Sequence, residues 1–196
     1  MRLIITRHGQ TEENREGILM GHNPGILSEK GKEQAKKVAE RLKDEKIDFI
    51  YTSDLARAKD TAKEISKFHS KAPFKVVKEL RERNLGEFQG KKKSDLGWKT
   101  GEFKSTSIDP KEGESRKEFC ERARNFLDKI FLKHEKETVL FVAHNGINKA
   151  IISSITGKNL EEVENQKNTA ISIFKIDKDR NYKLEIFNCV KHLNDI

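Results

Sequence analysis

Two histidines directly follow the two most convincing apolar runs of the sequence. Residues 3–6 lead into Arg7 and His8. Residues 138–143 lead into His144. Short apolar runs bounded by polar residues are typical of buried strands. Because ligands of open α/β sheets bind beyond the carboxyl ends of the strands, we expect both imidazoles at the mouth of one cleft.

Two arginines are expected at the same cleft. Arg7 precedes His8, and Arg57 falls in the first turn of a helix expected after the strand at 49–51. A helix N-terminus favours anions, and the planar guanidinium matches phosphate oxygens in pairs. Either arginine alone could equally form an ordinary surface ion pair. Together they predict a site that repels cations and grips a dianion.

These residue types are suited to phosphoryl transfer, which needs a nucleophile, charge neutralisation and a proton for the leaving oxygen. Imidazole has an ordinary pKa of about 6.5, so much of it is neutral near pH 7 and can attack phosphorus. We interpret His8 as this nucleophile, with its other ring nitrogen held by a backbone carbonyl in the turn at Gly9. His144 would then hydrogen-bond a phosphate oxygen and stabilise the charged transition state.

The proton donor is harder to choose from spacing. A loop carboxyl over a phosphate pocket has its pKa raised by the dianion and by burial, and lowered by the arginines. The residue pattern favours Glu82 only slightly, and a surface position remains the alternative for each candidate. Five glutamates of expected loops are candidates: Glu12, Glu13, Glu82, Glu87 and Glu114.

The elements that position these residues alternate between strands and helices. This order predicts an α/β fold, a three-layer αβα sandwich whose mainly parallel sheet ends in an antiparallel C-terminal edge hairpin. Ser53 or Asp54 is expected to cap the second main helix, whose apolar stripe reaches Phe68. The hairpin strands are expected to alternate polar with apolar residues. Strands are expected at 3–7, 49–51, 74–77, 138–143, 171–176 and 182–187, and helices after Ser28, at 55–68, after Ser115 and at 147–155.

Four segments resemble the signatures of the histidine phosphatase superfamily, the clan of cofactor-dependent phosphoglycerate mutases and related phosphatases. Arg7-His8-Gly9-Gln10-Thr11 with Asn14 resembles its opening signature. The segments 53–58, 80–90 and 142–146 resemble the motifs of its second arginine, its acid and its second histidine. The order and spacing agree over about residues 2–175, which implies a phosphoglycerate mutase-like fold.

The resemblance also implies roles for individual residues. His8 would become phosphorylated, and Glu82 would donate a proton and later activate water. No metal or cofactor is implied, and two histidines beside arginines make a poor cation site. The implied catalytic residues are His8, Glu82, Arg7, Arg57 and His144. The implied substrate-binding residues are Thr11, Asn14, Gly21 and Asn145.

Two segments depart from the family pattern. Residues 23–28 differ from the frequent Asp-x-Pro-Leu-Thr, and Asn145-Gly146 stands where many relatives have Gly-Gly. We expect one domain over residues 1–196 with a short lid around 91–112, since that segment lacks periodicity. The lysines at 91–93, together with Trp98 and Phe103, are expected to contact the leaving group.

Composition narrows the class of protein. Of 196 residues 34% are apolar and 37% charged, and 40 basic against 32 acidic residues give a net charge of +8. Because most lysines are interleaved with acids, we expect a solvated face and attraction of small anions, and no nucleic-acid partner. With two cysteines, no apolar run of membrane-spanning length and no room for a signal peptide, we expect a cytoplasmic protein and no membrane partner. A homodimer is compatible with the sequence.

The expected function is hydrolysis of small phosphorylated metabolites through a phosphohistidine intermediate. The alternative is a cofactor-dependent phosphoglycerate mutase that uses the same residues. Because mutases of this family carry a longer insertion over the pocket, the short segment between Gly90 and Gly113 favours hydrolysis. A non-catalytic binding protein is disfavoured because both nucleophile and acid are present. The basic composition hints at a multiply charged substrate such as a sugar phosphate or nucleotide.

Overall fold

The computed structural model describes residues 1–97 and 108–194. One six-stranded sheet runs through it, in the order β3-β2-β4-β1-β5-β6. β1, β2, β3 and β4 are parallel, whereas β5 is antiparallel to both β1 and β6. The mainly parallel sheet with an antiparallel C-terminal edge is therefore confirmed. The strands are β1 (Arg2–Arg7), β2 (Phe49–Ser53), β3 (Phe74–Val77), β4 (Thr138–Ala143), β5 (Ile171–Ile176) and β6 (Tyr182–Cys189).

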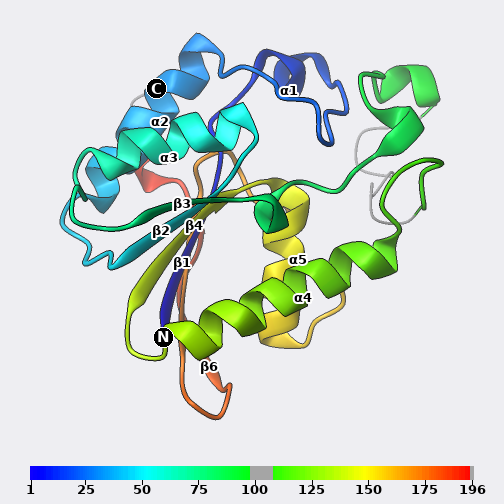
Figure 1. Ribbon diagram of the computed structural model, residues 1–196. Coiled ribbons are helices and arrows are strands. Elements are labelled where there is room, and N and C mark those ends of the chain that lie inside the picture. The colour runs from blue at the N-terminus through cyan, green and yellow to red at the C-terminus, as the bar shows by residue number, and fades with distance from the viewer. Residues whose placement is uncertain (98–107, 195–196) are drawn as a thin grey trace.

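Helices cover both faces of the sheet, which gives the expected three layers (Figure 1). One core joins Val38 and Ile65 of the first layer to Ile4 of β1. The other core joins Phe119 of the third layer to Leu3, the neighbour of Ile4. Successive strand residues point to opposite faces, so one strand supplies both cores. The first layer holds α2 (Glu29–Leu42) and α3 (Ala56–Ser66), and the third holds α4 (Arg116–Lys133) and α5 (Asn145–Thr156).

Several short elements carry no periodic signal and were not predicted. Helix α1 (Glu12–Glu16) has only five residues and no buried side chain. The turns of 3-10 helix are Lys78–Leu80, Gly86–Phe88, Ser94–Leu96 and Lys191–Leu193. Two of them flank the segment that carries Glu82.

The expected cap of α3 is wrong. Leu55 is the N-cap residue, and no side-chain hydrogen bond caps this helix. Ser53 lies two residues before this N-cap, and it accepts a hydrogen bond from the Leu55 N–H at 3.2 Å, not from an amide in the first turn of α3. Asp54 instead forms an ion pair with Arg81. Phe68 lies beyond the end of α3 and is 49% exposed, so it is not part of the apolar stripe.

Strand β5 does not alternate as an edge strand. Its first four residues are all buried, because it lies between β1 and β6 and both its faces are covered. β6 is the edge strand and is exposed or half-buried throughout. Helix α5 begins at Asn145, two residues before the expected start, so its N-terminus adjoins His144.

The expected lid begins on a fixed base. The Leu19 N–H donates to the Lys91 carbonyl at 2.9 Å, and the Lys93 N–H donates to the Gly17 carbonyl at 3.1 Å. The first residues of 91–112 are therefore tied to the loop after α1. Trp98 and Phe103 lie outside the described residues.

Candidate active site

The two histidine rings meet at the carboxyl edge of the sheet. β1 and β4 are parallel neighbours in a register that pairs Arg7 with Ala143, so His8 and His144 leave the sheet side by side. Their ring centroids lie 5.1 Å apart, and both side chains are buried. This spacing lets one phosphate group contact both rings.

One hydrogen bond orients His8. Its Nδ1 lies 2.7 Å from the Gly9 carbonyl oxygen, so Nδ1 carries the proton and the neutral ring keeps a lone pair on Nε2. Burial lowers the pKa of His8 well below 6.5, and the charges of Arg57 and Arg7 lower it further. His8 is therefore uncharged at neutral pH, as a nucleophile must be. The expected backbone contact in the turn at Gly9 is confirmed.

His144 has the opposite tautomer. Its Nδ1 accepts a hydrogen bond from Arg57 Nε at 3.2 Å, which leaves the proton of the neutral ring on Nε2. That Nε2 is buried and has no partner among the described residues. The pKa of His144 is also held well below 6.5, mainly by burial and then by Arg57. The ring therefore presents an unused donor.

Arg57 is 1% exposed and holds a loop in place. Its Nη1 donates to the carbonyls of Asn23 at 2.5 Å and Pro24 at 2.9 Å. Its Nη2 donates to the Gly21 carbonyl at 2.9 Å. Burial lowers its pKa to about 10, so the guanidinium remains charged. Arg57 thus joins the 21–24 loop to His144, and most of its donors are engaged within the protein.

Arg7 is less fully engaged. Its Nη1 donates to the Gln166 carbonyl at 2.9 Å, while its buried Nε has no partner among the described residues. Burial lowers the pKa of Arg7, and the nearby carboxylate of Glu82 opposes that shift. Asn145 supports this arrangement, because its Oδ1 accepts the Gln166 N–H at 2.7 Å.

Glu82 reaches the same edge of the sheet from a loop. Its Oε2 accepts the Gly146 N–H at 2.9 Å, and its Oε1 accepts the Arg83 N–H at 3.0 Å. A Cβ at position 146 would overlap Glu82 Oε1, so any larger residue there would displace this carboxylate. The carboxylate therefore lies at the N-terminus of α5, next to His144.

The structure separates Glu82 from the other candidate acids. Glu114 is engaged by Arg122, whose Nε and Nη2 donate to its two oxygens at 2.7 Å each. Glu12 pairs with Arg15, and Glu87 is exposed. Glu13 lies beside Gly25, where its charge opposes the lowering of the pKa of Arg57.

Comparison with known proteins decides the family. A model of the histidine phosphatase superfamily, branch 1, matches residues 3–189. The chain belongs to this superfamily. Phosphoglycerate mutase-like protein 4 of Arabidopsis thaliana is 31% identical over 98% of this chain and 87% of its own. The metal-independent phosphoserine phosphatase of the same plant is 32% identical over 99% and 84%. A mycobacterial glucosyl-3-phosphoglycerate phosphatase superposes with a TM-score of 0.84 at 26% identity, over 96% of this chain and 99% of that one.

In this histidine phosphatase, the side chains of Thr11 and Asn14 shape the loop after His8. Thr11 Oγ1 accepts the Asn14 N–H at 3.1 Å, and Asn14 Oδ1 accepts the Thr11 N–H at 3.3 Å. Gly21 has a φ of +51°, and a Cβ there would overlap the side chain of Gln89. Contact of these three residues, and of Asn145, with a ligand stays a prediction.

Three supporting residues were not predicted. His22 Nε2 lies 2.9 Å from the Glu82 carbonyl oxygen, and the His22 N–H donates to Gln89 at 2.6 Å. Asn168 Nδ2 donates to the His8 carbonyl at 2.9 Å. The only sequence signal was that His22 directly follows Gly21, in a segment otherwise typical of a turn.

A metal site is not apparent in the described part of the chain. Over residues 1–97 and 108–194, no three histidine, cysteine or acidic side chains gather as ligands for one ion. Apart from the Glu82 carboxylate, the groups around the histidines are cationic or neutral donors, which suits an anionic ligand.

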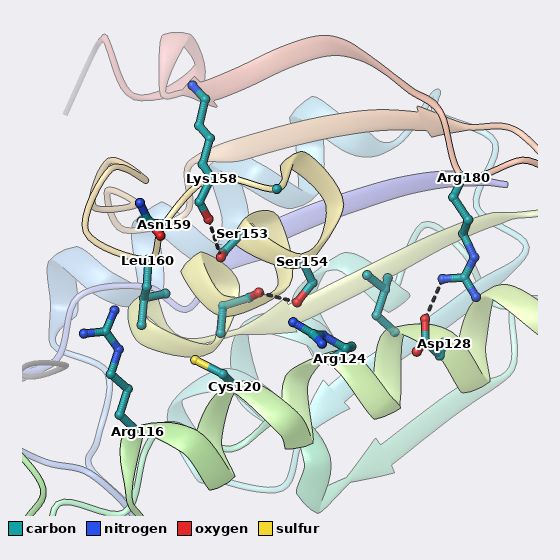
Figure 2. Close-up of a pocket in the computed structure, with 13 residues that line it drawn as sticks. Arg116, Cys120, Arg124, Asp128, Ser153, Ser154, Lys158, Asn159, Leu160 and Arg180 are labelled. Atoms are coloured by element: carbon teal, nitrogen blue, oxygen red, sulfur yellow. Dashed lines mark hydrogen bonds and ion pairs between the residues drawn. The ribbon is translucent and has the colours of Figure 1, made fainter.

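A separate cavity of about 520 Å³ lies between α4 and α5 (Figure 2). Arg124 and the ion pair of Arg180 with Asp128 line it, and no histidine does. Burial raises the pKa of its Cys120 thiol, which disfavours a thiolate nucleophile. The groups suited to phosphoryl transfer are therefore those around His8.

Proposed function

We propose that this histidine phosphatase hydrolyses small phosphorylated metabolites through a covalent phosphohistidine on His8. One observation carries the proposal. A neutral His8 with a free Nε2 lone pair lies 5.1 Å, ring to ring, from a neutral His144 with a free Nε2 donor. At this spacing the lone pair of His8 can reach the phosphorus of a phosphoryl group while the N–H of His144 donates to one of its oxygens.

Binding of the phosphate dianion would use donors that lack partners among the described residues. These are Arg7 Nε and His144 Nε2. The N-terminus of α5 adds its partial positive charge. Arg57 would act mainly through His144 and the 21–24 loop. The resemblance adds Thr11, Asn14, Gly21 and Asn145 as walls of the pocket.

In the first step His8 Nε2 attacks phosphorus, and the bond from phosphorus to the ester oxygen breaks. Glu82 gives its proton to the leaving alkoxide, which departs as an alcohol. The charge on the transferring group is stabilised by Arg7, Arg57 and His144.

In the second step water attacks phosphorus, and the bond from phosphorus to His8 Nε2 breaks. Glu82, now a carboxylate, takes the proton of that water. Inorganic phosphate leaves, and the lone pair of His8 is restored. Neither step requires a metal or another cofactor.

Phosphoglycerate mutase activity is the second candidate, since one relative is named mutase-like and the other a phosphatase. The same residues would serve, with the phosphoryl group returned to the substrate instead of to water. The short segment between Gly90 and Gly113, the proposed lid of this single domain, favours hydrolysis.

The other partners follow from charge and composition. Lysines of α2 and α3 pair with acids three residues away, as in Lys32 with Glu29 and Lys63 with Asp60. This supports a solvated face and no nucleic-acid partner. Among the described residues, no helix has the length and apolar character of a membrane span. The two free cysteines support a cytoplasmic location. A homodimer stays compatible with the sequence.

The test measures phosphate release from a panel that includes phosphoserine and sugar phosphates, and isomerisation of 3-phosphoglycerate. We expect phosphate release that His8→Asn abolishes, and an acid-labile phosphoenzyme that the same variant lacks. His69→Asn is the control, because His69 contacts the Leu42 carbonyl and lies outside the site. Isomerisation without phosphate release would replace the proposal by the mutase, and full activity of His8→Asn would refute the nucleophile.

A further inference from the structure

The segment that carries Glu82 has no regular secondary structure of its own. It runs from the turn Lys78–Leu80 to the turn Gly86–Phe88, and residues 81–85 between them belong to no helix or strand. A proton donor must stay within hydrogen-bond reach of the leaving oxygen. The position of Glu82 therefore depends on side chains that hold this segment from other elements.

One guanidinium, that of Arg122 in α4, contacts most of the segment. Its Nη1 donates to the carbonyls of Glu79 at 2.6 Å and Arg81 at 3.0 Å. Its Nη2 donates to the carbonyl of Glu82 itself at 3.3 Å. Nε and Nη2 complete the set by donating to Glu114 at 2.7 Å each. All five donors of the Arg122 guanidinium are thus used.

Glu114 fixes the direction of that guanidinium. Its two oxygens receive the paired donors of Arg122, the geometry in which arginine and carboxylate bind most strongly. Glu114 is also joined to the segment directly, since its N–H donates to the Asn84 carbonyl at 2.9 Å and its Oε2 accepts the Asn84 N–H at 3.3 Å. Both side chains are largely buried, at 21% and 15% exposed.

We infer that Arg122, oriented by Glu114, is a positioning residue that holds the proton donor Glu82 against the N-terminus of α5. The inference rests on the proposed function, in which Glu82 protonates the leaving group. Arg122 does not touch the histidines. It acts through the backbone of Glu82, whose carboxylate then meets the Gly146 N–H.

The neighbouring arginines do not duplicate this role, whereas His22 shares it at the Glu82 carbonyl. Arg81 pairs with Asp54, and Arg83 contacts the Glu114 carbonyl and Asp109. Those side chains hold the residues on either side of Glu82. The carbonyl of Glu82 itself is held by Arg122 and by His22.

Lysine cannot replace this arginine. Its ammonium has three donors on one atom, whereas the carbonyls and the carboxylate around Arg122 require a planar five-donor fork. Arg122→Lys keeps the positive charge and most of the side-chain volume. It therefore separates positioning from electrostatics.

The leaving group provides the decisive readout. Hydrolysis of an alkyl phosphate such as phosphoserine needs a proton on the departing oxygen, whereas p-nitrophenolate departs without one. We expect kcat/KM of Arg122→Lys and Glu114→Gln to fall about 10²-fold for the alkyl phosphate, the scale of a small displacement of a catalytic group. For p-nitrophenyl phosphate, kcat/KM of these variants should change little. Glu82→Gln is the reference variant and should likewise lose kcat/KM for the alkyl phosphate but not for p-nitrophenyl phosphate.

Arg124→Gln is the matched control. Arg124 lies on the same helix, is exposed, and has no hydrogen bond or ion pair to another described residue. Arg124→Gln should hydrolyse both phosphates with the same kcat/KM as the unaltered protein. The inference would be overturned if Arg122→Lys lost kcat/KM equally on the two phosphates while Glu82→Gln lost it only on the alkyl phosphate. Equal losses would indicate a general weakening of the fold, which lowers hydrolysis of both substrates. No loss on either would overturn it too.

A second measurement does not depend on activity. Hydrogen exchange of the Gly146 amide, which donates to Glu82, should be faster in Arg122→Lys and unchanged in Arg124→Gln. Unchanged exchange in Arg122→Lys would contradict the inference. If the unaltered protein hydrolyses neither phosphate, the proposed function fails, and the exchange of Gly146 still decides whether Arg122 holds Glu82.

Discussion

At the scale of single residues, the site depends on two neutral imidazoles with opposite tautomers. The Gly9 carbonyl fixes the proton of His8 on Nδ1, and Arg57 Nε fixes that of His144 on Nε2. Burial removes the charge of both rings, and the arginines reinforce this effect. A nucleophile and a donor of the same residue type are thus distinguished only by their hydrogen bonds.

This arrangement predicts how activity depends on pH. An ordinary imidazole is half protonated at about pH 6.5. Because the pKa values of His8 and His144 are lowered, both rings stay neutral at that pH and become protonated only at lower pH. For p-nitrophenyl phosphate, whose leaving group needs no proton from Glu82, we expect kcat/KM, corrected for ionisation of the substrate phosphate, to hold between pH 7.5 and 6.5 and to decline only below.

The measurement is a kcat/KM profile from pH 8 to pH 4.5, with NMR titration of the histidine ring protons in phosphate-free buffer. His8→Asn identifies the resonance of His8. An acidic limb of the profile centred at or above pH 6.5, matched by the titration of His8, would contradict the assigned environment.

At the scale of elements, close backbone approaches set the position of the His8 loop. A Cβ on Gly31 in the first turns of α2 would overlap the backbone of Gln10, and a Cβ on Gly9 would overlap the Gly31 carbonyl. The Gln10 carbonyl also accepts the Ser28 N–H at 3.0 Å. Helix α2 therefore supports the active-site loop through main-chain contact.

Gly31→Ala should disturb both stability and activity. The added methyl meets backbone atoms, which cannot rotate away, so we expect overpacking of about 1–3 kcal/mol and a shifted loop at residues 8–10. Denaturant unfolding measures the first effect and kcat/KM the second.

Gly157→Ala is the control for that prediction. Gly157 caps α5 at a φ of +72°, where a Cβ meets no atom within 4 Å. The left-handed conformation makes the substitution unfavourable by about 1–2 kcal/mol, but activity should persist. Equal kcat/KM in Gly31→Ala and the unaltered protein would refute the role of α2.

The sequence was sufficient to predict the strands and what stands at their ends. The apolar runs before His8 and His144 determine where β1 and β4 end, and the parallel pairing of these strands brings their carboxyl ends together. The burial of β5 was not predicted, because it depends on which strand becomes the edge. The side chains of Arg122 and Asn168 bind backbone carbonyls of distant segments, and the position of a backbone carbonyl cannot be predicted from residue types.

At the scale of the whole molecule, charge is divided between surface and site. The net charge is +8, yet many surface lysines lie next to acids on the same helix face. Such exposed pairs contribute little to stability and are screened by salt. The cations that lie close to the histidines, Arg7 and Arg57, are less screened because they are largely withdrawn from solvent, and attract a dianion more strongly.

The C-terminal segment makes global stability depend on pH through one histidine remote from the site. His192 lies in the turn Lys191–Leu193, where Thr169 Oγ1 is 3.3 Å from its Nε2 and its buried Nδ1 has no partner among the described residues. Burial, with the charge of Arg41, lowers its pKa to about 4. In the unfolded chain its pKa returns to about 6.5.

Between these two values the unfolded state binds the extra proton, so the free energy of unfolding must fall as pH decreases from 6.5 to 4. Since the ring is only half-buried, solvent screening limits this contribution to about 1–2 kcal/mol. We expect His192→Gln to lose less stability over this range than the unaltered protein, by urea unfolding at pH 7, 5.5 and 4.5. Carboxylates and the other histidines titrate in both proteins, so the difference between the two slopes isolates His192. Parallel slopes would show that this ring takes up its proton as readily in the folded chain as in the unfolded one.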